Sequence, residues 1–401
     1  MTAPDSAANA PPLSRLGVVG IAAAAGLVPL NSTMIAVALP SIADDFDISV
    51  GRVSILITVY LVAMLLGQPL SGRVSDRIGN RRSVNAALVG FAAFSLACAA
   101  SGSFGFLVAA RGGQAAFASA LAPSVQSLLR TGTEPAERGR MFGILGSVLG
   151  VGAAGGPVIG GGLTELFGWQ AIFLVNIPVV AVALTASVRS GGSSFEPSVS
   201  SPLKREHGPG RIANRVFAAS FSAQAFSTQA QYTLLLLTPI ILTARGWKSG
   251  SIGIMLSALT VGMIVFGPAG GRAGDRLGRR TPVMGGLAFA TVSMVVLFFA
   301  GAGISPTLLV VTLIVFGIGL GVATPNFMTA ALESVPESRA GSAAGVLSMS
   351  RYVGSITTSV AVTAFVSTDA GGSRILLGMA VVSMAMAIWM AVWMPGTRSH
   401  S

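Results

Sequence analysis

Charged side chains inside long apolar stretches are the residues most able to do chemistry in this sequence. Arg111 and Arg351 each fall well inside such a stretch, whereas none of the 14 Asp and Glu residues does. Ionisable groups at such positions are costly and are functional-site hypotheses by default. Because arginine stays protonated, two arginines without a nearby carboxylate predict an electropositive interior. We expect such an interior to accept neutral, zwitterionic or anionic molecules better than organic cations, which an unpaired cation repels.

Amide side chains accompany these arginines. Asn31 and Arg111 are predicted to lie roughly 13 Å and 10 Å inside their helices, at ~1.5 Å per residue, and are therefore candidate partners. Gln224, Thr228 and Gln231 are spaced i, i+4 and i+7, which places a polar stripe on one helical face. Six residues are our candidates for a substrate cavity: Asn31, Arg111, Gln224, Gln231, Asn326 and Arg351. Hydrogen bonds between helices, or from arginine to backbone carbonyls, are the structural alternative.

Several kinds of chemistry are excluded by residue counts. The chain has one cysteine, Cys98, and two histidines, His207 and His400, both in polar stretches. A disulfide framework, a thiolate metal site and a nucleophile or metal cluster within the apolar stretches all need more of these residues. No segment is large enough to hold an ATP-binding domain with its Gly-rich phosphate loop. We therefore expect no metal, no cofactor and no enzymatic activity.

The overall composition is that of an integral membrane protein. Of 401 residues 52% are apolar and 10% are charged, whereas soluble proteins carry about 25% charged residues. A membrane-spanning helix needs roughly 20 predominantly apolar residues, and the sequence contains twelve such runs. They cover residues 16–40, 53–72, 83–101, 104–128, 141–163, 170–188, 216–243, 251–271, 281–302, 306–331, 341–365 and 375–394. The predicted fold class is an all-α membrane protein.

Basic residues predict the orientation of these spans. Of the 25 Lys and Arg residues, 19 fall in segments that share a side with the N-terminus, four fall on the opposite side and two lie within spans. Positive charge is retained on the cytoplasmic side, so both termini are predicted to be cytoplasmic. The net charge of +11 therefore needs no nucleic-acid partner. Residues 1–14 and 395–401 read as disordered tails, and 189–215 as a cytoplasmic linker between domains 15–188 and 216–394.

An internal repeat relates these two domains. The segment GRVSDRIGNR at 72–81 recurs as GRAGDRLGRR at 271–280, and the same offset of 199 residues maps Pro69 onto Pro268 and Pro40 onto Pro239. Two six-helix halves in the same orientation are typical of transporters whose substrate site lies between the halves. In the fifth span, Gly152, Gly156 and Gly160 recur every four residues, which predicts a groove for a partner helix. Pro157 lies in the same span and removes one backbone donor.

Taken together, these motifs resemble the major facilitator superfamily, in its drug:proton antiporter branch. The resemblance covers nearly the whole chain. It rests on the repeated loops and on four further segments: LNSTMIAVALPSI (30–42), RGGQAAFASALAPSV (111–125), GVGAAGGPVIGGGL (150–163) and PESRAGSAAGVLSMSRYVG (336–354).

The resemblance implies roles for several residues. The loops are expected to act in gating, through Gly72, Asp76, Arg77, Gly271, Asp275 and Arg276. Asn80 departs from the family, which often has a basic residue there, and Asn31 stands where the branch commonly has a proton-carrying Asp. The Gly-Pro signature that contains Pro157 marks exporters in this family.

The function implied is export of a small amphipathic molecule, drug-like or metabolic, from the cytoplasm by alternating access and proton antiport. Because Asn31 cannot titrate, a peripheral carboxylate such as Glu165 or Asp76 would have to carry the proton. The alternative is an importer or facilitative uniporter on the same fold. The expected setting is a bacterial inner membrane, with a small-molecule substrate, protons and lipid as partners and a monomeric chain.

Overall fold

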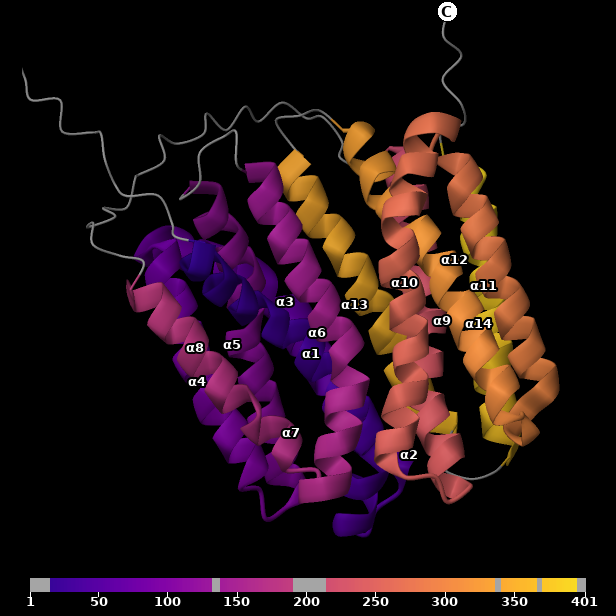
Figure 1. The fold of residues 1–401 in the computed structure, drawn as a ribbon, viewed down its shortest axis with the longest axis horizontal. Coiled ribbons are helices and arrows are strands. Elements are labelled where there is room, and N and C mark those ends of the chain that lie inside the picture. The colour runs from indigo at the N-terminus through magenta and orange to yellow at the C-terminus, as the bar shows by residue number, and fades with distance from the viewer. Residues whose placement is uncertain (1–14, 132–137, 190–213, 336–339, 366–369, 395–401) are drawn as a thin grey trace, which may run out of the picture.

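The computed structural model describes residues 15–131, 138–189, 214–335, 340–365 and 370–394, and within these ranges the regular structure is entirely helical (Figure 1). The predicted tails and almost all of the predicted linker lie outside the described residues. Eight of the described helices are long and apolar enough to cross a membrane. The molecule is therefore an all-α membrane protein, as the composition predicts.

Each predicted span coincides with a helix. The N-terminal half contains α1 (Arg15–Asp45), α2 (Val50–Val53), α3 (Ile55–Ile78), α4 (Asn80–Ala99), α5 (Phe104–Thr131), α6 (Arg138–Phe167), α7 (Ala171–Leu174) and α8 (Asn176–Arg189). The C-terminal half contains α9 (Arg215–Ala244), α10 (Ser249–Leu277), α11 (Arg280–Ala300), the short 3₁₀ helix η1 (Gly301–Gly303), α12 (Pro306–Glu333), α13 (Ala340–Phe365) and α14 (Ala370–Ala391). The short helices α2 and α7 lead into α3 and α8, so each pair corresponds to one predicted span.

Local sequence explains where several helices begin and end. The Asn214 side chain accepts a hydrogen bond from the Phe217 amide at 2.8 Å and caps α9, as Asn does at helix N-termini. Ser305 caps α12, and Pro306 follows it in the first turn, where a missing amide proton costs nothing. Gly79 and Gly278 have φ angles of 87° and 78°, which favour glycine. These two glycines occupy equivalent positions in the repeated loops and separate α3 from α4 and α10 from α11.

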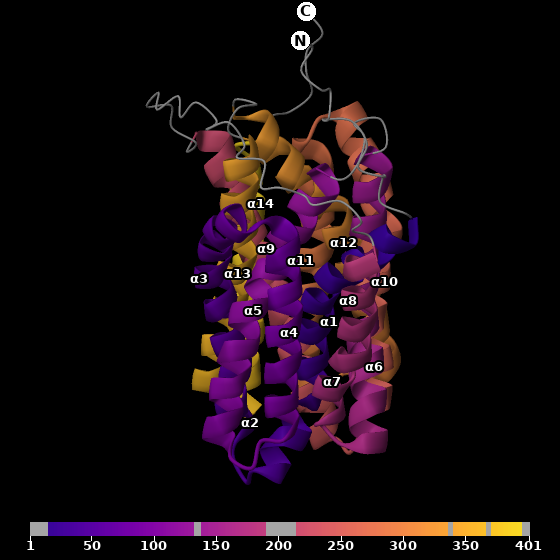
Figure 2. The ribbon, with the colours of Figure 1, turned by 90° about the vertical axis from the view of Figure 1, so that its left-hand side faces the viewer.

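The helices form two bundles that lie side by side (Figures 1 and 2). Across the boundary α6 packs against α10, α3 against α13 and α1 against α9. We call the end at which α1, α6, α9 and α13 finish the distal end, and the end at which they begin the proximal end. The chain crosses from one end to the other in each long helix, so the repeated loops lie at the proximal end.

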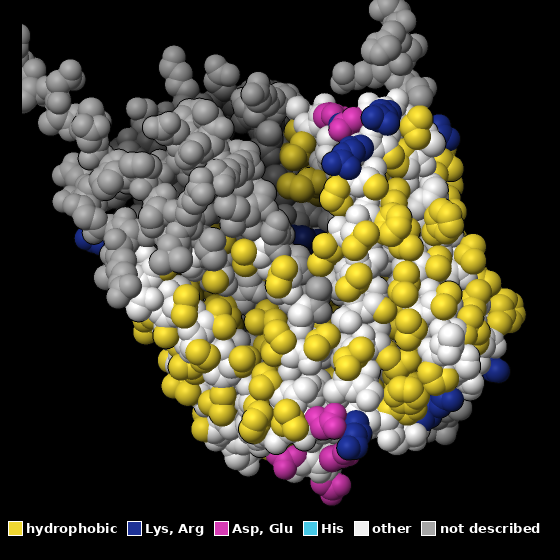
Figure 3. Space-filling model, in the orientation of Figure 1, with side chains coloured by type: hydrophobic (Ala, Val, Ile, Leu, Met, Phe, Trp, Pro, Cys, Tyr) yellow, Lys and Arg dark blue, Asp and Glu magenta, His cyan; other side chains and the backbone are white. Residues whose placement is uncertain are grey.

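The surface has the pattern of a membrane protein. Hydrophobic side chains cover much of the described surface in the middle of the face seen in Figure 3, and most of the charged side chains visible there lie towards its two ends. Large apolar residues such as Leu66, Val151 and Phe299 are more than 60% exposed. In water such a surface would be a large apolar patch, so it is suited to contact with lipid.

Candidate functional site

Arg111 of α5 lies in the interior of the N-terminal half. Its side chain is 1% exposed. It donates hydrogen bonds to the side-chain oxygen of Asn31 on α1 and, at 2.5 Å, to that of Gln114 one turn further along α5. The guanidinium carbon lies 4.1 Å from the ring centre of Tyr60 and 5.6 Å from that of Phe173. The structure thus joins Asn31 to Arg111, the pair that similar depth suggested.

The contacts of Arg111 extend into a wider polar network. Gln114 donates to the Ser95 hydroxyl at 2.6 Å, and Asn176 donates to the same hydroxyl at 3.2 Å. Because these residues come from α4, α5 and α8, and Asn31 comes from α1, the network ties four helices together. Its amides and hydroxyl are neutral, so Arg111 keeps its positive charge without a carboxylate among the described contacts. Sequence reasoning missed Gln114, Ser95 and Asn176, although Gln114 is three residues from Arg111 and shares its helical face.

A narrow crevice connects this network to the C-terminal half. It is lined by Tyr60, Arg111 and Tyr232 together with Ser32, Ile35, Ile57 and Leu61. Tyr232 belongs to α9, so the crevice lies on the boundary between the bundles. Tyr60 is 1% exposed, whereas Tyr232 is half-buried. The aromatic rings and the Arg111 guanidinium, which stacks on the Tyr60 ring, leave little free space here.

Arg351 of α13 has very different surroundings. It is exposed, and none of the ion pairs between described residues includes it. The lipid-facing side of α13 is marked by exposed Val346, Val353 and Val360. At about 100° per residue, Arg351 points roughly 140–180° away from these three valines. The exposed side chain of Arg351 therefore faces the interior of the molecule. Its exposure indicates open space between the bundles at this depth.

Two tyrosines lie near Arg351. The neighbouring Tyr352 accepts a hydrogen bond at 2.8 Å from Gln68 of α3, which crosses the boundary between the bundles. Arg351 lies close enough to Tyr232 and Tyr352 to interact with both electrostatically. The chain has only three tyrosines, and all three, Tyr60, Tyr232 and Tyr352, therefore lie along this boundary.

The remaining predicted cavity residues are placed in helix contacts. Gln224 is 7% exposed, and its side-chain oxygen is buried without a hydrogen-bond partner. Gln231 is half-buried and contacts the sulfur of Met263 on α10 at 3.4 Å. Both lie on α9, which packs against α1 of the other half.

Asn326 differs from the prediction. It is fully buried, and its amide nitrogen donates to the carbonyls of Gly270 and Val322, each at 2.9 Å. Gly274 leaves the room that the Asn326 side chain fills. The residue therefore joins α12 to α10 within the C-terminal half and does not line a cavity, because small residues on α10 let the two helices approach closely.

Two sets of contacts close the distal end. In the hydroxyl seam, Ser54 and Thr58 of the N-terminal half meet Thr363 and Ser359 of α13, at 2.5 Å and 2.7 Å between side-chain oxygens. Ser359 also donates to the Ser54 carbonyl at 3.0 Å. Sequence reasoning missed this seam. The spacing of four residues places the two hydroxyls of each half on one helical face but does not identify their partners. Buried hydroxyls that pair with one another hold helices together in lipid.

The glycine seam joins α6 to α10 at the same end. A Cβ atom on Gly253 would overlap the Pro157 carbonyl, and one on Gly161 would overlap the Ser249 carbonyl. Beside this seam the Glu165 carboxylate accepts the Gly250 amide at 3.0 Å and lies 3.6 Å from the Lys248 ammonium. The two backbones therefore touch, and Glu165 spans the boundary.

The predicted groove on α6 faces a different partner. Cβ atoms on Gly152, Gly156 and Gly160 would meet the Gly26 carbonyl, Thr33 and the Met34 backbone, all on α1. These glycines thus pack α6 against α1 inside the N-terminal half. Pro157, which lies between them in sequence, turns its carbonyl towards α10 in the other half.

The repeated loops are described for the C-terminal half. Asp275 accepts a hydrogen bond from Arg279 at 2.7 Å, and Arg279 also donates to Glu333 at 2.9 Å. The hydrogen bond to Glu333 raises the pKa of Arg279 further above its usual range. Arg276 is exposed and Gly271 is half-buried. The side chains of Gly72, Asp76 and Arg77, predicted for the other loop, lie outside the described residues.

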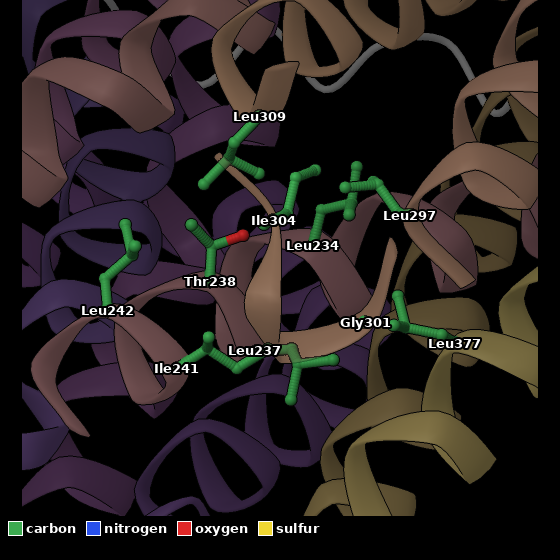
Figure 4. A pocket seen from close by; sticks show the side chains of 10 residues that line it. All are labelled: Leu234, Leu237, Thr238, Ile241, Leu242, Leu297, Gly301, Ile304, Leu309 and Leu377. Carbon is green, nitrogen blue, oxygen red and sulfur yellow. The ribbon is translucent and has the colours of Figure 1, made fainter. Parts of the chain in front are cut away.

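A separate pocket lies in the C-terminal half towards the distal end (Figure 4). Leu234 and Leu237 of α9, Leu309 of α12 and Leu377 of α14 line it, and Thr238 supplies its one polar side chain. The leucines are less than 5% exposed. The apolar walls of this pocket suit an apolar ligand and provide few hydrogen-bonding groups that could orient a polar molecule. Among the described residues, no cluster of His, Cys, Asp and Glu could hold a metal ion.

The two bundles, the polar boundary between them and one closed end define a membrane transporter. A family model for the Major Facilitator Superfamily matches residues 21–357 and 216–401, and the chain belongs to this family. A Bacillus subtilis protein described as an uncharacterized MFS-type transporter, YvkA, is 27% identical over 392 residues, covering 85% of this chain and 88% of that protein.

Other relatives have more specific descriptions. The multidrug efflux pump LfrA of Mycolicibacterium smegmatis is 26% identical and covers 82% of this chain and 76% of the pump. The riboflavin transporter RibZ of Clostridioides difficile is 23% identical, over 78% of this chain and 79% of that protein. Among solved structures, a bacterial homologue of the human lysosomal transporter Spinster, in an inward-facing and occupied conformation, has a TM-score of 0.78 at 17% identity. It covers 96% of this chain and 97% of that one, and it supports the shared fold.

Proposed function

We propose that this transporter exports a small amphipathic molecule from the cytoplasm by alternating access. The observation that carries the proposal is the difference between the two ends of the boundary. The hydroxyl seam and the glycine seam close the distal end, whereas Arg351 is exposed on the inner side of α13. Transporters built from two parallel repeats work by rocking the halves around such a site.

The predicted orientation and one of the relatives support export as the direction of transport. With the proximal end in the cytoplasm, as the basic residues predict, the exposed interior opens inward and receives substrate from the cell. A multidrug efflux pump is among the relatives that match most of the chain. The setting we propose is a bacterial inner membrane with both termini cytoplasmic, and the working unit is the monomer.

Import or facilitated diffusion of a metabolite is the second candidate. It is favoured by the riboflavin transporter among the relatives and by Asn31, which cannot carry a proton.

Proton antiport in this chain needs a carboxylate at another position. Glu165 is the described carboxylate that contacts the other half, through the Gly250 amide and Lys248. We therefore assign proton coupling to Glu165.

Reconstitution into vesicles of known orientation tests these assignments. Export by proton antiport predicts that an imposed pH gradient, acidic on the distal side, drives uptake of substrate from the proximal side against its concentration gradient. A Glu165→Gln variant should retain exchange between equal concentrations of substrate and lose the response to the pH gradient. An Asp47→Asn variant, which changes an exposed carboxylate at the same end, is the matched control. Transport that only equalises concentrations in both directions would support the uniporter instead.

A further inference from the structure

The side chains around Arg351 are suited to one class of ligand. A guanidinium offers a fork of donors that matches a carboxylate or a similar planar anion. Arg351 has this group exposed towards the interior, and no described ion pair occupies it. The described carboxylates lie at helix ends, as with Asp45, Glu165 and Glu333. An anion near Arg351 is therefore attracted without competition from a fixed negative charge on the described residues.

Aromatic rings complete the same region. Tyr352 follows Arg351 directly, and its hydroxyl is held by Gln68 of the other half. Tyr232 of α9 is half-buried and lines the crevice that also contains Tyr60. Rings fixed in this way favour stacked or edge-to-face contacts with another aromatic ring. Arg111, the other arginine that the structure describes within a long apolar helix, has its guanidinium enclosed by Asn31, Gln114 and the Tyr60 ring.

We propose that Arg351, Tyr352 and Tyr232 form a subsite for a planar aromatic compound that carries an acidic group. The acid group pairs with the Arg351 guanidinium, and the ring lies against the two tyrosines. The subsite rests on the proposed transport function and narrows its substrate class. It also changes which arginine we expect to pair with the substrate, because Arg351 is exposed, whereas Arg111 is 1% exposed and bonded to Asn31 and Gln114.

Binding of three matched probes tests this subsite. The full-length protein in detergent micelles is dialysed against 2-naphthoate, 2-naphthamide or 2-naphthylmethylammonium, which share a ring system and carry negative, neutral and positive groups. We expect the carboxylate to bind roughly tenfold more tightly than the amide, the usual gain of a hydrogen bond to a charged partner. The ammonium probe should bind more weakly than the amide. Equal or tighter binding of the ammonium probe, or no measurable binding of the carboxylate, would overturn the proposal.

Two variants separate the contributions of charge and ring. Arg351→Gln should bring the carboxylate down to the affinity of the amide and leave the amide unchanged, whereas Tyr232→Leu should weaken all three probes together, by roughly threefold to tenfold. Arg374→Gln, which removes an exposed arginine at the start of α14, is the matched control and should retain the preference. A preference that survives Arg351→Gln would contradict the assignment.

The experiment is independent of the proposed direction of transport. Binding in micelles requires no gradient and no second membrane face. A carboxylate preference in a protein that fails to export would overturn the proposed function and leave the subsite intact. Export of a compound together with no preference among the probes would overturn the subsite and leave the proposed function intact.

Discussion

Arg111 of the N-terminal half and Arg351 of the C-terminal half are both charged residues within long apolar helices, yet they have opposite surroundings. Arg111 is enclosed by Asn31, Gln114 and two aromatic rings, whereas Arg351 is exposed on the inner side of α13. A buried cation that is hydrogen-bonded to a neighbouring helix holds the helices in place, and an exposed one is free to bind a ligand. The same residue type therefore positions helices in one half and is available to select a substrate in the other.

The internal repeat sharpens this difference. The repeat offset of 199 residues places Ala230 and Val310 at the positions of Asn31 and Arg111, and Gly152 at the position of Arg351. Neither arginine has a counterpart in the other half. The two halves thus share helices and loops, while the two arginines within their apolar helices are particular to each half.

The largest expected effect is on stability, from Arg111→Leu. The substitution leaves the buried amide oxygens of Asn31 and Gln114 without a donor, and we expect a loss of about 2–4 kcal/mol. Thermal unfolding can be followed with a thiol-reactive dye, since Cys98 is the single cysteine and is fully buried. Arg351→Leu should change stability by about 0.5 kcal/mol or less. Equal losses in the two variants would remove the distinction between the arginines.

Glycines on neighbouring helices should separate folding from conformational change. Gly156→Val drives a side chain into Thr33 of α1 within one half, which should cost about 2 kcal/mol of stability. Gly253→Val wedges the glycine seam apart between the halves and should favour opening of the distal end. Gly162→Val is the control, because no other atom lies near its Cβ position.

Thiol labelling can measure whether these substitutions open the distal end. In a Cys98→Ala background, a cysteine at Ser355, which is 1% exposed on α13, should react with a membrane-impermeant reagent applied to the distal side only when that side opens. We expect faster labelling in Gly253→Val and unchanged labelling in Gly156→Val and Gly162→Val. Faster labelling in all three would show that the glycine contacts do not divide in this way.

The architecture was predictable from sequence because it depends on repeated, coarse features. Apolar runs of the right length predicted every long helix, and the GRVSDRIGNR repeat predicted two halves. Helices extend beyond the predicted spans, as α1 does to Asp45, because backbone hydrogen bonding continues past the apolar run. The short helices α2 and α7 carry no periodic signal of their own and were not predicted.

The site was less predictable because it depends on which face each residue presents. The estimated depth along each helix predicted that Asn31 and Arg111 lie close together. It could not predict that the Arg111 side chain is enclosed and the Arg351 side chain is exposed. A polar residue in an apolar helix, such as Asn326, is typical of a cavity lining. In the structure Gly270 and Gly274 let α10 approach Asn326 closely, so its side chain is buried between helices. The hydroxyl seam joins residues about 300 positions apart, such as Thr58 and Ser359, and no local pattern reports such a contact.

The hydroxyl seam offers a smaller test of the closed distal end. Replacing Thr58 by Val together with Ser359 by Ala removes hydrogen bonds that average about 0.6 kcal/mol each in membranes. A total near 1 kcal/mol should raise the labelling rate of the Ser355 cysteine about fivefold. Thr357→Val, on the lipid side of α13, should leave it unchanged. An unaltered rate in the double variant would mean that the glycine seam alone closes this end.

The smallest effect concerns the repeated loops at the proximal end. In the C-terminal half Arg279 bridges Asp275 and Glu333, and the equivalent positions in the N-terminal half are Asn80, Asp76 and Glu134. In sequence, the N-terminal half thus keeps both acids and has Asn80 in place of the arginine. Arg279→Asn makes the C-terminal loop like its counterpart and should cost about 0.5–1 kcal/mol, the range for partly exposed ion pairs.

The reciprocal substitution tests whether an arginine at this position contributes equally to stability in the two halves. Asn80→Arg should stabilise the protein by a similar amount, and both effects should shrink in high salt, which screens exposed charges. Arg276→Asn, which changes an exposed arginine outside the described ion pairs, is the control and should be neutral. If Asn80→Arg destabilises the chain while Arg279→Asn also does, the two loops have diverged in geometry as well as in sequence. The two halves would then differ at the proximal loops as they already do at their arginines.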